Sequence, residues 1–423
     1  MSDISEHIVI VGAGAAGLMA ARELARAGRK VTILEARLRC GGRIHPLPPA
    51  EFGYPADGGA EFVHGEAPVT RALLREAGLS LREIEGEQWS FDGTTLSRHH
   101  RHDRHEAQLQ AVLRDLKDDL TVADFLRRHF SGAEYAPMRR SIERMVEGYD
   151  AADPERASTL ALRAEWMDGG HAPQARIDGG YGALIDALAA DCRRHGVNIR
   201  LGCAVSAIAE EGGAVIVRCA GGDVKACDRV ILTVPLPLLR EIALPASVRT
   251  KLAAADDIGF GNVIKILFRF ARPWWRERKE DLADMTFLLS DETIPVWWTQ
   301  YPGQHPLLTG WLGGPRTAEL EALDSQTLID AGLDSLAAIF KRSRQDIARD
   351  LVASAAINWA HDPFAGGAYS WATPRTREAQ AILACADGLV LFSGEALYRG
   401  RDMGTVEAAL ASGLETAEMI LQS

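Results

Sequence analysis

The chain of 423 residues has few cysteines, no long apolar run and no excess of positive charge. Its six cysteines are irregularly spaced and form no CxxC pair, which disfavours a disulfide framework and predicts a reduced, cytoplasmic protein. No apolar stretch reaches the roughly 18 residues that span a bilayer, and the N-terminus lacks the basic region of an export signal. The net charge of −11 disfavours nucleic acids and anionic lipids as partners.

The rest of the composition is typical of a globular protein, with 47% apolar and 25% charged residues. The length predicts about two to three domains. Glycine is the one excess, at 40 residues. We therefore expect several tight turns or close backbone approaches.

A dinucleotide-binding pattern opens the chain. HIVIV at 7–11 predicts a strand, the next residues predict a helix that ends before Gly28, and KVTILEA at 30–36 predicts a second strand. The turn between the first strand and the helix carries the glycines of a GxGxxG pattern. Glu35 follows at the end of the second strand, where a carboxylate can accept both ribose hydroxyls. That carboxylate disfavours a ribose 2′-phosphate, so NADP is not expected.

Further along, residues 70–165 read as a helical insertion, with apolar positions at helical spacing. A helix over 178–196 and short β-type runs to about 234 predict a return to the nucleotide-binding part. Residues 236–384 mix strands with a helix around 323–341. A last strand in GLVLFSGEA and a closing helix complete the chain.

Five segments, in this order, resemble motifs of the flavin-containing amine oxidase family: ILEARLRCGGRI (33–44), DGGAEFVHG (57–65), GFGNVIKILFRF (259–270), NWAHDPFAGGAYSW (358–371) and FSGEALYRGRDMGTVEAALASG (392–413). The resemblance covers nearly the whole chain. It is closest to polyamine oxidases and to the catalytic portion of lysine-specific histone demethylases, and more distant to monoamine oxidases.

The resemblance implies an α/β fold with two domains. Residues 1–75, 177–235 and 385–423 would form a discontinuous, Rossmann-like FAD-binding domain, and residues 76–176 and 236–384 an α+β substrate-binding domain. Ala368 stands where monoamine oxidases carry the cysteine that tethers the flavin, so FAD is expected to bind noncovalently. The expected cofactor-binding residues are Gly12, Gly14, Ala15, Gly17, Glu35, Ala36, Arg37, Gly42, Arg43, Gly59, Ala60, Glu61, Val205, Trp359, Gly394, Glu395, Gly404, Thr405 and Val406.

Lys265 is the first candidate catalytic residue. On a strand it shares a face with Val263 and Leu267, so its ammonium lies between apolar neighbours. Periodicity alone favours an ordinary half-exposed strand lysine. The resemblance implies instead that Lys265 holds a water against flavin N5.

Two further candidates come from the last motifs. Tyr369 matches one wall of the family's aromatic cage for the amine, although a core tyrosine with a bonded hydroxyl is the alternative. Thr405 stands where monoamine oxidases have the opposite tyrosine, which implies a roomier pocket. The helix that starts there is expected to present unpaired amides of Thr405 and Val406 to the flavin pyrimidine ring.

Histidines supply weaker candidates. His64 matches a tunnel histidine of some polyamine oxidases that could orient an amine or accept its proton, and a turn histidine bonded to backbone is an equal alternative. Trp359 packs near the flavin or only in the core. No metal site is expected among the irregularly spaced His99, His100, His102 and His105.

The resemblance implies an enzyme that transfers hydride from the α-carbon of a small-molecule amine to flavin N5. The imine is hydrolysed to an aldehyde or ketone, and O2 reoxidises the flavin to give hydrogen peroxide. An L-amino-acid oxidase or a C–C desaturase of the same superfamily is the alternative, but no arginine can be assigned to a substrate carboxylate. A flavin-binding interaction module is less favoured, because the first strand begins at His7 and the net charge is acidic.

Overall fold

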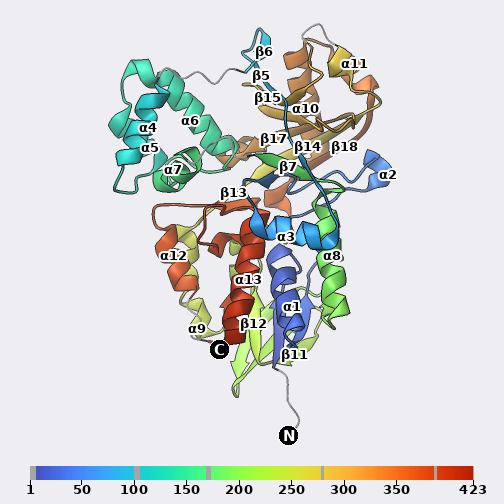
Figure 1. Cartoon of the computed structure of the whole chain (residues 1–423), viewed down its shortest axis with the longest axis vertical. Helices are drawn as coiled ribbons and strands as arrows, with labels where there is room; N and C mark the ends of the chain where they lie inside the picture. Colours follow the sequence, from blue (N-terminus) through green and yellow to red (C-terminus); the bar gives the residue numbers. More distant parts are fainter. Residues whose placement is uncertain (1–5, 100–104, 168–172, 278–280, 385–387, 423) are drawn as a thin grey trace.

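The computed structural model describes residues 6–99, 105–167, 173–277, 281–384 and 388–422. The lower half of the molecule in Figure 1 is built around a parallel sheet, and the upper half holds a larger mixed sheet beside a group of helices. Within the described ranges, no helix has both the length and the apolar character needed to cross a membrane.

The lower sheet has five parallel strands. Their order is β20 (Val390–Phe392), β12 (Arg229–Leu232), β1 (His7–Val11), β2 (Lys30–Leu34) and β8 (Asn198–Arg200). The predicted strand–helix–strand unit at the start of the chain is thereby confirmed. Every strand of this sheet falls in the segments assigned to cofactor binding, although the domain bounds themselves stay a prediction.

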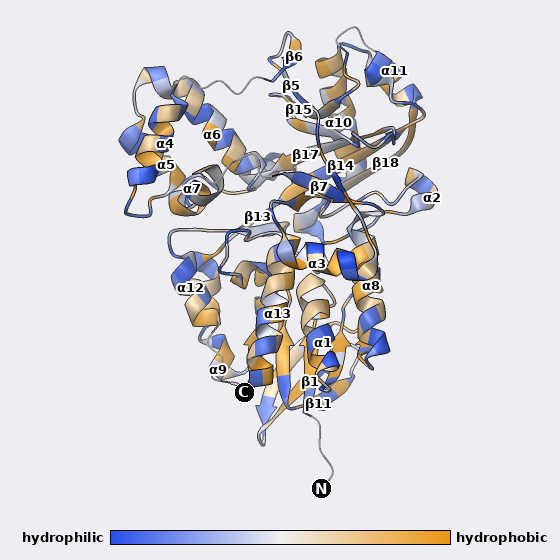
Figure 2. Cartoon of the chain, viewed as in Figure 1, coloured by the Kyte–Doolittle hydropathy of each residue, from blue (hydrophilic) through white to orange (hydrophobic). Residues whose placement is uncertain are grey.

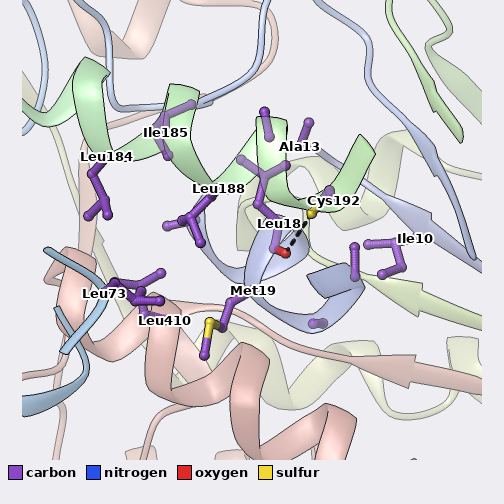
Figure 3. Packing of buried hydrophobic residues seen from close by; sticks show 14 of the residues in the cluster. Ile10, Ala13, Leu18, Met19, Leu73, Leu184, Ile185, Leu188, Cys192 and Leu410 are labelled. Atoms are coloured by element: carbon purple, nitrogen blue, oxygen red, sulfur yellow. Dashed lines mark hydrogen bonds between the residues drawn. The ribbon is translucent and has the colours of Figure 1, made fainter. Parts of the chain in front are cut away.

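The alternation of β1 explains how both faces of this sheet are covered. Ile8 and Ile10 belong to a core formed with three helices, α1 (Ala15–Arg26), α8 (Gly180–Arg194) and α13 (Val406–Gln422). Figure 3 shows Ile10 on the side of this core where Leu18 and Cys192 lie. Val9 and Val11 point to the opposite face.

The opposite face is covered by an antiparallel sheet of β9 (Val205–Glu211), β10 (Ala214–Cys219) and β11 (Val224–Cys227). Helices α9 (Ala246–Arg249) and α12 (Thr376–Leu383) lie on the same side. In Figure 2 the central strands are apolar, whereas the helices carry hydrophilic residues on their outer sides. The lower half therefore has three layers around one sheet.

The upper sheet has seven strands, and β14 lies near its edge. The order is β18 (Leu351–Asn358), β14 (Val263–Phe270), β17 (Leu307–Gly313), β16 (Val296–Thr299), β15 (Met285–Leu289), β5 (Glu87–Phe91) and β6 (Leu96–Arg98). Ile264, Ile266 and Phe268 pack under α10 (Ser325–Phe340), so Lys265 lies on the other face, as predicted. The short helix α11 (Arg344–Arg349) follows α10.

Smaller elements surround these sheets. Strand β7 (Gln174–Ile177) lies between β3 (Val63–His64) and β4 (Leu81–Glu83), and β13 (Gly259–Gly261) pairs with β19 (Tyr369–Trp371). The remaining helices are α2 (Pro49–Phe52), α3 (Pro68–Ala77), α4 (Glu106–Asp115), α5 (Val122–His129), α6 (Ala136–Gly148) and α7 (Thr159–Met167). Helices α4 to α7 form the group at the upper left of Figure 1.

The prediction that residues 70–165 are a helical insertion is partly wrong. Strands β4, β5 and β6 lie within it, and β5 joins the upper sheet by pairing in parallel with β15. Strand β4 pairs with β7 and strand β5 with β15, which lie far along the chain, and local periodicity carries no signal of such partners. Strand β6 pairs with β5 itself across the turn at residues 92–95, so this hairpin is a local feature that the helical prediction missed.

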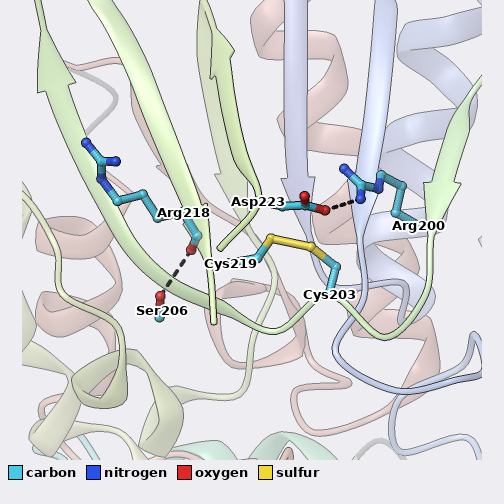
Figure 4. The surroundings of a disulfide bond; sticks show 6 residues. All are labelled: Arg200, Cys203, Ser206, Arg218, Cys219 and Asp223. Atoms are coloured by element: carbon cyan, nitrogen blue, oxygen red, sulfur yellow. Dashed lines mark hydrogen bonds and ion pairs between the residues drawn. A yellow bond between two sulfur atoms is a disulfide. The ribbon is translucent and has the colours of Figure 1, made fainter. Parts of the chain in front are cut away.

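The expectation of a fully reduced chain is also wrong, because Cys203 and Cys219 form a disulfide (Figure 4). Their Cα atoms lie 5.8 Å apart, since Cys203 stands just before β9 and Cys219 ends β10, the strand antiparallel to β9. Cys40, Cys192 and Cys227 are free thiols, and Cys385 lies outside the described residues. The cysteine argument for a cytoplasmic location therefore loses its support.

The double substitution Cys203→Ser/Cys219→Ser should lower the free energy of unfolding by about 3 kcal/mol, because the disulfide closes a short loop in the unfolded chain. Urea unfolding with and without a dithiol reductant measures this. The reductant should destabilise the wild type and Cys40→Ser but not the double variant. An equal response of all three proteins would contradict a native disulfide.

Candidate active site

A cavity of about 2740 Å³ is lined by residues of both halves of the molecule. Every residue predicted at the site lines this cavity, with the single exception of Gly17. The fold thus collects segments from the beginning, the middle and the end of the chain around one space.

The glycine turn shows two kinds of glycine. A Cβ on Gly17 would lie 2.1 Å from the Gly12 carbonyl oxygen, so Gly17 allows α1 to pack closely on β1. A Cβ on Gly14 would meet no atom within 4 Å, and Gly14 lines the cavity. The Gly14 backbone is therefore open to a ligand at the start of α1, where unpaired amides favour a phosphate.

Glu35 is held over this turn. Its Oε2 accepts the Ala13 amide at 2.7 Å and its Oε1 accepts the Arg37 amide at 2.8 Å. A carboxylate has about four acceptor positions, so two remain for the hydroxyls of a ribose. Ala36, Val205 and Gly42 line the cavity beside Glu35 and the glycine turn.

Two arginines of the 33–44 motif are paired with carboxylates from the end of the chain. The Arg37 guanidinium binds Asp362, with Nη1 and Oδ2 2.9 Å apart. Arg43 Nη1 donates to Glu395 at 2.8 Å and to the Ala368 carbonyl at 2.7 Å. Both arginines are therefore engaged by protein carboxylates, and their assignment to the cofactor stays a prediction.

Lys265 lines the same cavity and is buried at 1% exposure. Its Nζ donates to Glu61 Oε2 at 2.9 Å and to the Gly59 carbonyl at 3.0 Å, and it lies 5.3 Å from the centre of the Trp298 ring. An ammonium has three donors, so one remains for a water or ligand in the cavity. Burial opposes ionisation of Glu61, but Lys265 and Arg176 outweigh it and lower the Glu61 pKa to about 2.

Aromatic rings line the cavity next to Lys265. Trp311 is the residue opposite Lys265 on β17, and its ring is stacked with that of Tyr369 at 6.4 Å. The Tyr369 hydroxyl donates to the Tyr149 carbonyl at 2.6 Å. The neighbour of Tyr369 in this wall is therefore Trp311, while Trp359 packs nearby among Val263 and Ala368.

The prediction about the last helix needs a correction. The Thr405 amide is not unpaired, because it donates to the Asp402 carbonyl at 3.2 Å, and the Thr405 hydroxyl accepts the Ala408 amide. Thr405 thus caps α13, and the amide at the cavity is that of Val406, in the first turn of the helix. Gly404, at φ +86°, places its Cα next to Ser370 and Tyr369.

His64 is half-buried and bonded on one side by the protein. The Tyr149 hydroxyl lies 3.1 Å and Gln174 Nε2 3.4 Å from its Nδ1. Because an amide nitrogen only donates, Nδ1 accepts and the ring proton lies on Nε2. Burial lowers the His64 pKa to about 4, so the ring is neutral at physiological pH. This arrangement favours orienting an amine over accepting its proton.

Of the four histidines between residues 99 and 105, the structure describes His99 and His105. His99 and His105 line the cavity, and His105 packs against Tyr135 with ring centres 4.7 Å apart. His100 and His102 lie outside the described residues. In the part of the chain that the structure describes, no cluster of three potential metal ligands is present.

Sequence reasoning missed Trp298, Trp311, Arg176 and Tyr149. None of them lies in a segment that resembled a family motif, and strand register, which only pairing decides, brings Trp311 opposite Lys265. A signal was present in VWWT and LTGWLG, where tryptophans stand in strand-like runs. It could not tell which face of the sheet they occupy.

A family model described as flavin containing amine oxidoreductase matches residues 15–108 and 89–421. The chain belongs to this family. It is therefore an enzyme of the flavin-dependent amine oxidoreductase type, with the α/β fold and parallel sheet described above.

Two curated relatives illustrate the range of the family. The chain is 27% identical to a probable polyamine oxidase 4 of Arabidopsis thaliana, over 88% of this chain and 78% of that protein. It is also 27% identical to lysine-specific histone demethylase 2 of Homo sapiens, over 98% of this chain but 53% of that protein.

Solved structures share the fold. A putrescine oxidase bound to putrescine superposes with a TM-score of 0.82 at 20% identity, over 99% of this chain and 100% of that chain. Cyclohexylamine oxidase from Brevibacterium oxydans IH-35A gives 0.80 at 20% identity, over 99% of both chains. At this identity the likeness concerns the fold alone.

The residues present fit the flavin that the amine oxidoreductase family implies. Gly14 and Gly394 both leave open space above their Cα atoms at the cavity, where a side chain would obstruct a ligand. Glu35 keeps two acceptor positions, and Lys265 keeps one donor. The cavity therefore offers acceptors, a donor and open backbone to a ligand.

Gly14→Ala and Gly17→Ala should behave differently. Gly14→Ala adds a methyl group in the cavity, so we expect a folded protein that retains less than a tenth of the flavin. Gly17→Ala drives a methyl group into backbone, so we expect a melting temperature several degrees lower. Thermal unfolding and the ratio of flavin to protein absorbance measure both effects. Equal flavin loss at unchanged stability in both variants would contradict the distinction.

His64→Gln should leave the pH dependence of flavin reduction by amine unchanged between pH 6 and 9. His64 carries its proton only below about pH 4, so it does not titrate in that range. Rapid-mixing measurements without oxygen at each pH give the rates. If the acidic limb of the profile disappears in His64→Gln, His64 is the titrating group and its assignment as a neutral ring is wrong.

Proposed function

We propose that the chain is an FAD-dependent amine oxidase that converts a small-molecule amine and O2, through an imine that water hydrolyses, into an aldehyde or ketone and hydrogen peroxide. When bound, FAD would accept the hydride from the amine α-carbon at its N5 and pass the electrons to O2. The observation that carries the proposal is the cavity that joins the glycine turn and Glu35 to Lys265 and Tyr369.

The residues nearest the glycine turn would hold the dinucleotide. Gly12, Gly14 and Ala15 offer backbone at the start of α1, and Glu35 accepts the ribose hydroxyls. Ala368 lines the cavity and offers no nucleophile, which supports noncovalent binding. The other proposed contacts are Ala36, Arg37, Gly42, Arg43, Gly59, Ala60, Val205, Trp359, Gly394, Glu395, Gly404, Thr405 and Val406.

At the other end the chain's own groups would bind and orient the amine. The rings of Tyr369 and Trp311 exclude water and offer π faces to the approaching nitrogen. Neutral His64 can orient the amine without repelling it by charge. Lys265 would hold a water with the N–H that its protein partners leave free, and Thr405 leaves more space than a tyrosine would.

The small-amine class is supported by the names of the relatives, polyamine oxidase and putrescine oxidase. An amino acid is the alternative: Arg37 and Arg43 are paired with Asp362 and Glu395, so its carboxylate would need another arginine of the cavity, such as Arg140, Arg316 or Arg401. A cytoplasmic location stays a prediction, which the cysteines no longer support because of the Cys203–Cys219 disulfide. The sequence does not distinguish a monomer from a homodimer.

An absorption spectrum of the purified protein, followed by titration with amines without oxygen, tests the function. We expect a yellow protein, release of FAD on denaturation, bleaching by at least one mono-, di- or polyamine, and peroxide on readmission of air. Amino acids are included in the panel to test the alternative oxidase. A colourless protein that takes up no FAD would refute the proposal, and flavin that no amine bleaches would favour a non-catalytic module.

Lys265→Met should retain the yellow cofactor but slow flavin reduction or reoxidation at least tenfold, because the donor that faces the cavity is lost. Rapid-mixing absorbance measures each half-reaction. Lys225→Met, on β11 away from the cavity, is the matched control and should react at the wild-type rate. Wild-type rates in Lys265→Met would remove this lysine from the mechanism.

A further inference from the structure

The motif of residues 57–65 predicts that Glu61 contacts the cofactor directly. In the structure, groups of the protein itself surround its carboxylate. Lys265, Arg176, Gln300 and Trp298 all donate to its carboxylate, at 2.9 to 3.1 Å. These donors fill the acceptor positions of the carboxylate. Glu61 is 7% exposed, so it has little contact with water.

The donors come from three separate strands. Lys265 lies on β14, Arg176 on β7 and Trp298 on β16, while Gln300 directly follows β16. Arg176 also donates to the Thr299 and Tyr301 carbonyls, which fixes its guanidinium from the other side. Glu61 is therefore held rigidly, and the Gly59 carbonyl holds the same ammonium from two residues earlier in the chain.

A buried ion pair is not by itself a strong stabilising device, because apolar residues of similar size are often as stable. Because the Lys265–Glu61 pair lies at the cavity, its position favours a role in ligand binding over a role in stability. We propose that Glu61 is a positioning residue: with the Gly59 carbonyl, its carboxylate fixes the Lys265 ammonium so that the third N–H faces the flavin end of the cavity. This inference rests on the proposed function and gives Glu61 no direct contact with the cofactor.

Glu61→Gln tests the role, with Asp191→Asn as the matched control. Asp191 is likewise a buried carboxylate, paired with Arg22 and Arg26 at 2.8 Å, but it does not line the cavity. In flavin-loaded protein, Glu61→Gln should slow reoxidation by O2 at least tenfold and change the KM for amine less than twofold. Asp191→Asn should change neither quantity.

A double-mutant cycle shows whether Glu61 acts through Lys265. In the Lys265→Met background, Glu61→Gln should slow reoxidation by less than a further twofold. Additive effects, or a Glu61→Gln variant that behaves like Asp191→Asn, would overturn the inference and reduce Glu61 to a structural role.

The same cycle in the unfolding of flavin-free protein provides a readout without cofactor. The effects of Glu61→Gln and Lys265→Met on the unfolding equilibrium constant should deviate from additivity by at least tenfold, whereas those of Lys265→Met and Asp191→Asn should be additive. Absence of coupling would overturn the inference even in an active enzyme.

Where Glu61→Gln alone does not fold, recovery of the fold on adding Lys265→Met supports the pair, and continued failure contradicts it. Failure of the wild type to bind flavin would instead refute the proposed function.

Discussion

The buried contact between Lys265 and Glu61 is the interaction around which the two halves of the molecule meet. Glu61 lies in the 57–65 segment, just before β3, whereas Lys265 belongs to β14, the second strand from the edge of the upper sheet. Leaving either charge unpaired in this interior would cost several kcal/mol. The free energy of that pairing therefore constrains how the segment before β3 lies on β14, and with it the shape of the cavity.

A second constraint acts at the glycine turn between β1 and α1, where the close packing of backbone atoms, and not an ion pair, determines the geometry. Gly17 lets α1 pack closely on β1, whereas the space next to the Gly14 Cα is empty. Two glycines of one motif therefore serve different purposes, packing and ligand access. Carboxylates then hold the arginines of the next motif, as Asp362 and Glu395 do. The two arginines are therefore held in place before a ligand binds, which limits the side-chain ordering that binding requires of them.

Much of the lower half could be predicted from local pattern. The β-branched run at His7–Val11, the glycines and Glu35 each follow from short-range rules, and the structure confirms the strand–helix–strand unit. The pairing of β4 with β7 and of β5 with β15 could not be predicted, because these partners lie far along the chain. The β5–β6 hairpin is local and was missed in favour of helices. The disulfide was missed because the spacing of the cysteines does not specify the register of β9 with β10, which brings Cys203 to Cys219.

The sequence by itself determined the glycine turn between β1 and α1, the side of β14 on which Lys265 lies and the family motifs, because each depends on neighbours a few residues away. Only the tertiary structure decided that Glu61 pairs with Lys265, that Trp311 stacks with Tyr369 and that Thr405 caps α13 instead of offering a free amide. These features depend on strand register and on chain segments meeting across long distances. A single residue slip in that register would place the same side chains on the opposite face, and no local rule specifies it.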